Sequence, residues 1–224
     1  MTMEETLRRT LSEGAAALGF SIGKPEMEQF AVYHRELLLW NRRINLVSEK
    51  SSQQIVVRHF LDSLTAAPGI EQPEGSLLDI GSGGGFPGLP LRIVMPGLQV
   101  TLVESSRKKT SFLSHIIRML ALDEVMVIRE RVEVLIGERA CAGGFDTVIS
   151  RAAFKLPELL RMSSFFLKPG GTLIAMKGPS VQTEREEAEA VLKLTGMVCT
   201  DIRDIRLPEM DLSRNIIVYK RISG

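Results

Sequence analysis

The sequence predicts an α/β protein in which a doubly wound, mostly parallel sheet follows a helical N-terminal segment. Apolar residues recur at helical spacing in residues 1–70, whereas short apolar runs alternate with helical segments from Ser76 onward. Such alternation indicates a parallel sheet with helices on both faces. The last two apolar runs have no helix between them, which favours an antiparallel hairpin. We therefore expect a helical extension at residues 1–70 and an α/β domain at residues 71–224.

Composition limits the class of protein. The 224 residues are 44% hydrophobic, enough for a sizeable core, and 28 basic against 27 acidic residues give a net charge of +1. Global charge therefore does not indicate nucleic-acid binding, and a basic face would have to be local. Cys141, Cys199 and three separated histidines predict neither a disulfide framework nor a structural metal. The sequence shows neither a signal segment nor a membrane-spanning run, so we expect a cytoplasmic enzyme that contacts no membrane.

Three helices are expected in the first part of the chain. Residues 3–18 have apolar side chains at helical spacing. Pro25 opens a second helix in its first turn, where proline is tolerated, and an apolar stripe continues to Ile44. A third helix is expected at residues 53–67, because Pro68 and Gly69 end the pattern.

The rest of the chain alternates strands and helices. Strands are expected at residues 77–80, 100–103, 125–128, 145–150, 172–176, 198–205 and 215–219. Helices are expected at residues 89–94, 106–122, 156–167 and 181–194. The result is a seven-stranded sheet, parallel except for its last strand.

A glycine-rich turn after the first of these strands is the most informative stretch. Residues 77–88 read LLDIGSGGGFPG, a buried strand, a glycine cluster and the start of a helix. Glycines here let the backbone turn sharply and let a ligand approach the main chain. Gly83-x-Gly85-x-x-Gly88 matches a dinucleotide fingerprint. Asp79-x-Gly81-x-Gly83-x-Gly85, however, is the usual order in S-adenosylmethionine-dependent methyltransferases. Asp79 would serve the amino end of that cofactor directly or through its hold on the loop.

Two further segments support the methyltransferase interpretation. Glu104 ends the next strand, about 20 residues after the glycines, where a carboxylate can accept the ribose hydroxyls of an adenosyl group. The alternative is a carboxylate that caps the following helix. By their position in the fold, residues 131–133 are expected to border the adenine, and a solvated run of charges is the alternative. Residues 168–171 form a Lys-Pro-Gly-Gly turn, which class I methyltransferases often carry. We therefore expect a Rossmann-like class I methyltransferase domain.

The methyl acceptor is less directly marked. Residues 149–154 lack the Asn/Asp-Pro-Pro-aromatic loop of many adenine amino-methyltransferases, and neither cysteine follows a proline as in cytosine C5 enzymes. Guanine N7 carries a free lone pair in the plane of the base. Its methylation requires alignment and exclusion of water but no general base. The absence of an obvious base is compatible with N7 chemistry without establishing it.

Several motifs resemble the RsmG family, also called GidB. They include residues 78–91, Trp40-Asn41 with residues 44–46, and residues 58–63, 103–109 and 149–152. The resemblance implies N7 methylation of a guanine in 16S ribosomal RNA, on the RNA or on the small ribosomal subunit particle. Carried over by position, it implies cofactor contacts at Gly81, Phe86, Val132, Glu133 and Arg151. The alternatives are a methyltransferase that acts on another RNA, a protein or a small molecule, and a non-catalytic assembly factor that binds ribosomal RNA.

Basic residues around these motifs are candidates for substrate contact. Arg151 ends the strand beside which the acceptor base should enter, so it is the candidate catalytic residue; a structural salt bridge is the alternative. Arg107, Lys108 and Lys109 begin a helix, where cations oppose the helix dipole, and this favours a phosphate-binding role. Arg58 and Lys177 would extend the RNA-binding surface. His59 is interpreted either as a buried hydrogen-bonded histidine or as an RNA contact. We expect a monomer.

Overall fold

The computed structural model describes residues 3–49, 51–138, 141–207 and 212–222. Its centre is a seven-stranded sheet with the order β3-β2-β1-β4-β5-β7-β6. The strands are β1 (Ser76–Ile80), β2 (Gln99–Val103), β3 (Val125–Ile128), β4 (Phe145–Arg151), β5 (Leu167–Lys177), β6 (Met197–Leu207) and β7 (Leu212–Arg221). Strands β1 to β5 are parallel to one another, while β7 runs antiparallel to both β5 and β6. This confirms the predicted fold class.

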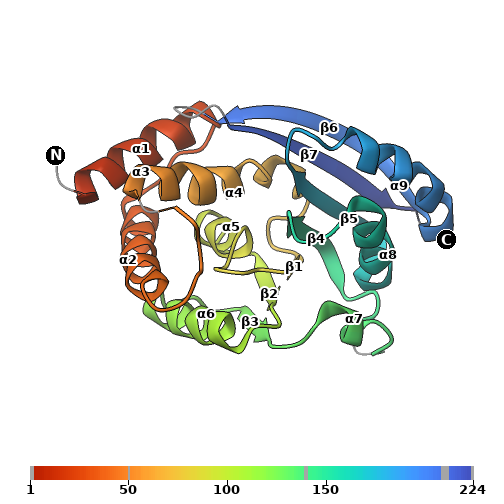
Figure 1. Cartoon of the computed structure of the whole chain (residues 1–224), viewed down its shortest axis with the longest axis horizontal. Coiled ribbons are helices and arrows are strands. Elements are labelled where there is room, and N and C mark those ends of the chain that lie inside the picture. Colours follow the sequence, from red (N-terminus) through yellow and green to blue (C-terminus); the bar gives the residue numbers. More distant parts are fainter. Residues whose placement is uncertain (1–2, 50, 139–140, 208–211, 223–224) are drawn as a thin grey trace.

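Helices cover both faces of this sheet (Figure 1). The helices after β1 are α5 (Gly88–Val94), α6 (Arg107–Met119), α7 (Val132–Leu135), α8 (Leu156–Phe166) and α9 (Gln182–Thr195). The short helix α7 was not predicted, because four residues are too few to show a helical period. The other four lie where the sequence predicts them, within a few residues at each end.

The N-terminal helices differ from the prediction in one respect. Helices α1 (Met3–Ala17) and α2 (Lys24–Asn41) match it closely. The single helix expected at residues 53–67 consists instead of α3 (Ser52–Ile55), a π-helix η1 (Val56–Leu61) and α4 (Asp62–Leu64), followed by a 3₁₀ turn η2 (Ala67–Gly69). Ser51 begins α3 by accepting a hydrogen bond from the Gln54 backbone N–H on its side chain. π-helical turns occur frequently at functional sites.

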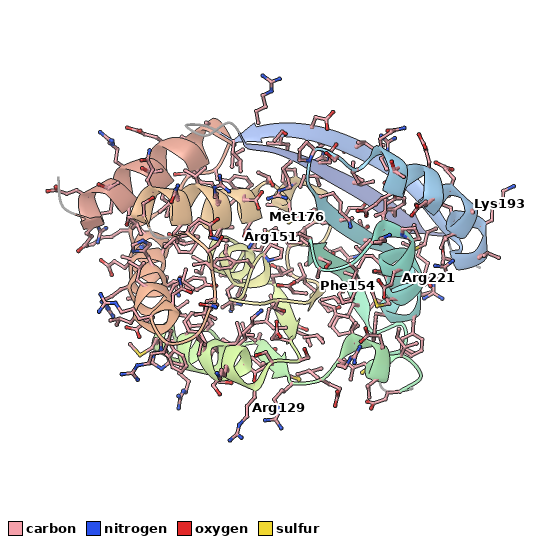
Figure 2. All side chains as sticks on the ribbon, viewed as in Figure 1. Arg129, Arg151, Phe154, Met176, Lys193 and Arg221 are labelled. Carbon is pink, nitrogen blue, oxygen red and sulfur yellow. The ribbon has the colours of Figure 1, made fainter. Side chains whose placement is uncertain are left out.

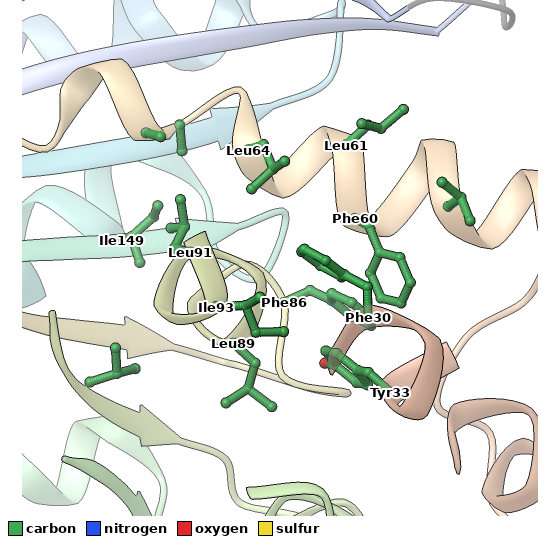
Figure 3. Close-up of a cluster of buried hydrophobic side chains, with 14 of the residues drawn as sticks. Phe30, Tyr33, Phe60, Leu61, Leu64, Phe86, Leu89, Leu91, Ile93 and Ile149 are labelled. Atoms are coloured by element: carbon green, nitrogen blue, oxygen red, sulfur yellow. The ribbon is translucent and has the colours of Figure 1, made fainter. Parts of the chain in front are cut away.

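Two apolar cores lie on opposite faces of the sheet. Alternate strand residues divide between them, so that Leu77 and Ile149 face one core and Leu78 and Val148 face the other. The first core unites the N-terminal helices with α5 and α6, and Figure 3 shows residues of α2, η1 and the α5 region meeting there. The second lies beneath α7, α8 and α9. The N-terminal helices thus complete one face of the sheet.

Within the described residues, no helix combines the length and apolarity needed to cross a membrane. The same residues contain no cluster of three or more His, Cys, Asp or Glu side chains able to hold a metal ion.

Candidate active site

The buried side chain of Asp79 fixes the start of the helix that follows the glycine turn after β1. Asp79 is fully buried, and its Oδ2 accepts a hydrogen bond of 2.9 Å from the backbone N–H of Gly88, the first residue of α5. Burial raises the pKa of Asp79 to about 7. Of the two roles that the sequence left open for Asp79, the structure therefore shows the hold on the loop.

The three glycines of the turn with positive φ angles have different surroundings. Gly81, Gly83 and Gly85 have φ angles of +76°, +58° and +95°, which favour glycine. A Cβ on Gly81 would lie 2.7 Å from Ala153, and one on Gly85 would lie 2.5 Å from a Leu89 methyl group. A Cβ on Gly83 would have no neighbour closer than 3.9 Å. Gly83 is therefore the glycine with open space for a ligand above it.

Glu104 ties this turn to the next helix. It directly follows the strand β2 and is 8% exposed. Its Oε2 accepts a hydrogen bond of 3.0 Å from the Gly83 N–H, and its Oε1 accepts one of 2.8 Å from the N–H of Ser106, which caps α6. The helix-capping alternative predicted from the sequence is thus present, and the same contacts fix the orientation of the carboxylate.

An open cleft of about 740 Å³ lies at the C-terminal ends of these strands. Five of the predicted cofactor residues line it, namely Gly81, Glu104, Val132, Glu133 and Arg151. Val103 and Phe154 add apolar surface to a wall that is otherwise largely polar. Because open α/β sheets bind ligands at this edge, the cleft is the candidate cofactor site.

Phe86 lies behind the turn. It is buried, stacks on Tyr33 of α2 with ring centroids 5.4 Å apart, and stacks on His59 with centroids 4.8 Å apart. The Tyr33 hydroxyl also donates a hydrogen bond to the Gly84 carbonyl. The side chain of Phe86 therefore supports the turn from the core rather than lining the cleft, and α2 contacts the turn directly.

Arg151, labelled in Figure 2, lies at the end of β4. It is held by the π-helix and the residue after it. Its Nη1 donates to the backbone carbonyl of Arg58 at 2.9 Å and to Oδ2 of Asp62 at 3.0 Å. Its Nη2 lies 3.0 Å from Nδ1 of His59, and its guanidinium carbon lies 5.2 Å from the centre of the Phe86 ring. The structural salt bridge predicted as an alternative is therefore present, and Arg151 also lines the cleft.

Sequence reasoning missed the acidic centre of this network. Asp62 is fully buried and also accepts two hydrogen bonds from Arg214 of β7, at 2.7 and 2.9 Å. Glu49 accepts a hydrogen bond of 2.7 Å from His59. The available signal was Asp62 itself, a carboxylate on the apolar side of a predicted helix, which buried surroundings tolerate only with a partner. The partners lie 89 and 152 residues away, and no local pattern marks them.

The predicted RNA-binding residues fall into three groups. Arg107, Lys108 and Arg58 are exposed. Lys109 is half-buried and lines the cofactor cleft. The Lys177 side chain is buried; its ammonium donates to the Phe154 carbonyl and to Glu184 at 2.7 Å. The fold itself thus uses the charge of Lys177, and the structure does not support an RNA contact there.

Comparison with known proteins gives consistent matches. Residues 26–213 match the family model GidB, described as rRNA small subunit methyltransferase G. A protein named ribosomal RNA small subunit methyltransferase G from Syntrophus aciditrophicus (strain SB) is 44% identical over 95% of this chain and 89% of its own length. A protein of the same name from Geotalea uraniireducens (strain Rf4) is 38% identical over 99% of this chain and 100% of its own.

Solved structures are similar in fold alone. Geranyl diphosphate C-methyltransferase from Streptomyces coelicolor A3(2), in complex with S-adenosyl-L-homocysteine, matches with a TM-score of 0.60 and 17% identity, over 85% of this chain and 98% of its own. Precorrin-6y C5,15-methyltransferase from Geobacter metallireducens GS-15 matches with a TM-score of 0.56 and 14% identity, over 80% and 92%.

Proposed function

The chain belongs to the GidB family of rRNA small subunit methyltransferase G; it is an S-adenosylmethionine-dependent methyltransferase of 16S ribosomal RNA, and we propose that its acceptor is N7 of a guanine. One observation supports the site assignment: Gly81 of the glycine turn, Glu104, whose carboxylate is fixed by the Gly83 N–H, and Arg151 line one cleft.

The residues of the cleft fit the cofactor chemically. Glu104 uses one acceptor position of each oxygen within the protein, which leaves further lone pairs for ribose hydroxyls. Val103 and Val132 supply an apolar surface suited to an adenine ring. Arg151 is a donor suited to the methionine carboxylate. Glu133, exposed at the cleft, would meet the polar edge of the adenine.

The proposed mechanism relies on alignment. When bound, S-adenosylmethionine supplies a methyl group on a positively charged sulfur. Because guanine N7 offers a lone pair and no proton must leave, the chain has only to orient the base and exclude water. We assign the orienting role to Arg151, which lines the cleft and is held by several contacts of the N-terminal helices.

The remaining elements of the proposal concern the substrate and its setting. Exposed Arg58, Arg107 and Lys108 are proposed to contact RNA phosphates, and Lys177 is left out because of its ion pair with Glu184. The substrate is the free RNA or the small ribosomal subunit particle. We also propose a cytoplasmic monomer, in which residues 1–70 form a helical extension of the domain at residues 71–224.

Transfer of a tritiated methyl group from labelled cofactor tests the proposal. Deproteinised 16S rRNA and assembled small subunits are compared as acceptors, with a protein extract and a metabolite pool as alternatives. We expect label in one of the two ribosomal substrates, and its loss when the RNA is transcribed with 7-deazaguanosine, which lacks N7. Label retained on the 7-deaza RNA would place the methyl group elsewhere and refute N7 as the acceptor.

A further inference from the structure

We propose that Glu49 and His59 form a positioning pair that orients the guanidinium of Arg151 over the cofactor turn. This inference rests on the proposed role of Arg151 in methyl transfer. Glu49 lies in the loop before α3 and His59 lies in η1, so the pair belongs to the N-terminal helices and not to the cofactor-binding fold.

Hydrogen-bond chemistry determines the tautomer of His59. An arginine guanidinium carries five donors and no acceptor, so Nδ1 of His59, 3.0 Å from Arg151 Nη2, must hold a free lone pair. The ring proton therefore lies on Nε2, which donates to Oε2 of Glu49 at 2.7 Å. Burial and the neighbouring Arg151 lower the pKa of His59 to about 4, which keeps the ring neutral. Glu49 thus selects the tautomer that Arg151 requires.

Two of the five N–H donors of the Arg151 guanidinium remain for a ligand. Nη1 uses both of its N–H groups on protein acceptors, the carbonyl of Arg58 and the carboxylate of Asp62. Nη2 uses one on His59. The second N–H of Nη2 and the N–H of Nε have no protein acceptor within the described part of the chain. Because Arg151 lines the cleft, these two donors are the ones available to a bound molecule.

The packing around His59 restricts its ring to one orientation. The imidazole stacks on Phe86 at an interplanar angle of 29°, and Phe86 also lies under the Arg151 guanidinium. The charged groups around His59 are Glu49, Arg58, Arg151 and Asp62, and Arg58 lies 3.8 Å from Glu49. Three Arg151 partners come from residues 58–62, so the π-helix and the residue after it present them together.

Two substitutions of similar size separate positioning from simple packing. In His59→Asn the side-chain oxygen takes the place of Nδ1 and can accept from Arg151, but the contact to Glu49 is lost. In His59→Gln the amide nitrogen takes the place of Nε2 and can donate to Glu49, but Arg151 loses its acceptor. We expect His59→Gln to reproduce most of the loss caused by Arg151→Ala, at least about tenfold in single-turnover methyl transfer or cofactor affinity. We expect His59→Asn to recover most of that loss.

A second arm tests the role of Glu49. Glu49→Gln retains an acceptor oxygen for the His59 N–H, whereas Glu49→Leu does not. Nitrogen NMR of the imidazole should show the Nε2–H tautomer in the wild-type protein and in Glu49→Gln, and a mixture of tautomers in Glu49→Leu. A wild-type ring protonated on Nδ1 would overturn the inference without any activity measurement.

His34→Gln is the matched control. His34 is a buried histidine of α2 that bonds Ser52 at 2.8 Å and is not among the described residues that line the cleft, so its replacement should lower stability without changing cofactor affinity. If Arg151→Ala is impaired while His59→Gln behaves like His34→Gln, the positioning pair is refuted and the proposed function stands. If Arg151→Ala itself has no effect, the role of Arg151 and the pair that depends on it are both refuted.

Discussion

At the scale of single residues, two glycines of the same turn have separable tasks. Gly83 has open space above it, whereas Gly85 faces Leu89 and the Tyr33 hydroxyl. Gly83→Leu should therefore abolish cofactor binding, because the side chain occupies the ligand space, while the fold assembles with a strain of about 1–2 kcal/mol from the positive φ angle. Calorimetric titration with S-adenosylhomocysteine measures the affinity. A normal affinity would rule out binding above this turn.

Gly85→Ala provides the contrast. The new methyl group would lie 2.5 Å from Leu89 and 2.6 Å from the Tyr33 oxygen, so the core has to move. We expect a loss of about 1–3 kcal/mol in the free energy of unfolding, measured by urea denaturation. Unchanged stability would show that the turn can shift away from α2.

Glu104 is predicted to bind ribose in addition to its two backbone contacts. Glu104→Gln should then weaken S-adenosylmethionine and S-adenosylhomocysteine alike, on the order of 1.5–3 kcal/mol, because both carry the same ribose. Calorimetry on both ligands, with thermal denaturation alongside, is the measurement. Lower stability with unchanged affinity for both ligands would show that Glu104 only accepts the hydrogen bonds of the Gly83 and Ser106 N–H groups and does not bind ribose.

At the scale of elements, α2 is part of the cofactor turn's support. Tyr33 is fully buried, stacks on Phe86 and donates to the Gly84 carbonyl. Tyr33→Phe keeps the ring but leaves that carbonyl without its partner, which should cost about 1–3 kcal/mol of stability. We also expect weaker cofactor binding, because the turn is less rigidly held. Urea denaturation and calorimetry on one sample measure both effects. Unchanged cofactor affinity together with a lower free energy of unfolding would show that α2 contributes to packing only.

The elements also show what sequence patterns can and cannot reveal. The strand, turn and helix at residues 76–94 were predictable, because an apolar strand, positive-φ glycines and a helix start are all local signals. The π-helical turn at Val56–Leu61 was not, because its apolar residues also fit an ordinary α-helix. The Arg151 side chain was placed correctly at the strand end, but its partners in that turn depend on how the N-terminal helices pack on the sheet.

At the scale of the whole molecule, RNA binding should depend on local charge rather than on the net charge of +1. Arg107 and Lys108 are exposed, whereas Lys109 lines the cleft. A change at Lys109 could alter cofactor binding as well as RNA binding, so Lys109 is left unchanged. Arg107→Ala with Lys108→Ala should weaken RNA binding and reduce the slope of log affinity against log salt by about one unit per lost phosphate contact. Filter binding measures the slope, and cofactor affinity should remain unchanged.

Exposed Lys193, on the distant helix α9, offers a matched control substitution to alanine. If the double variant keeps the wild-type slope, the RNA surface lies elsewhere, and Arg58 on the N-terminal helices becomes the next position to test.

Stability should fall as the solution becomes acidic. The pKa values of buried His34 and His59 are lowered from 6.5 to about 4, so the unfolded chain binds two more protons than the native state between these pH values. Asp79, whose pKa is raised from 3.8 to about 7, opposes this by one proton, because the native state holds its proton over the same range. The net effect of these groups is about 1.4 kcal/mol lost per unit decrease in pH.

Chemical denaturation at several pH values between 6.5 and 4.5 measures this slope. In Asp79→Asn the opposing contribution disappears, so we expect the slope to double roughly, whatever the absolute stability of the variant. A stability that stays level or rises on acidification would contradict the burial of neutral histidines.

The ion pair between Asp62 and Arg214 has a consequence for the order of events during synthesis. Its partners are separated by 152 residues, and Arg214 belongs to β7, which also contributes Val218 to the core beneath the N-terminal helices. Helices made early on the ribosome thus cannot complete their contacts until β7 has emerged from the exit tunnel. The carboxylate of Asp62, which holds Arg151, therefore gains its second arginine partner only after residues 212–221 have been translated, although Asp62 itself is translated early.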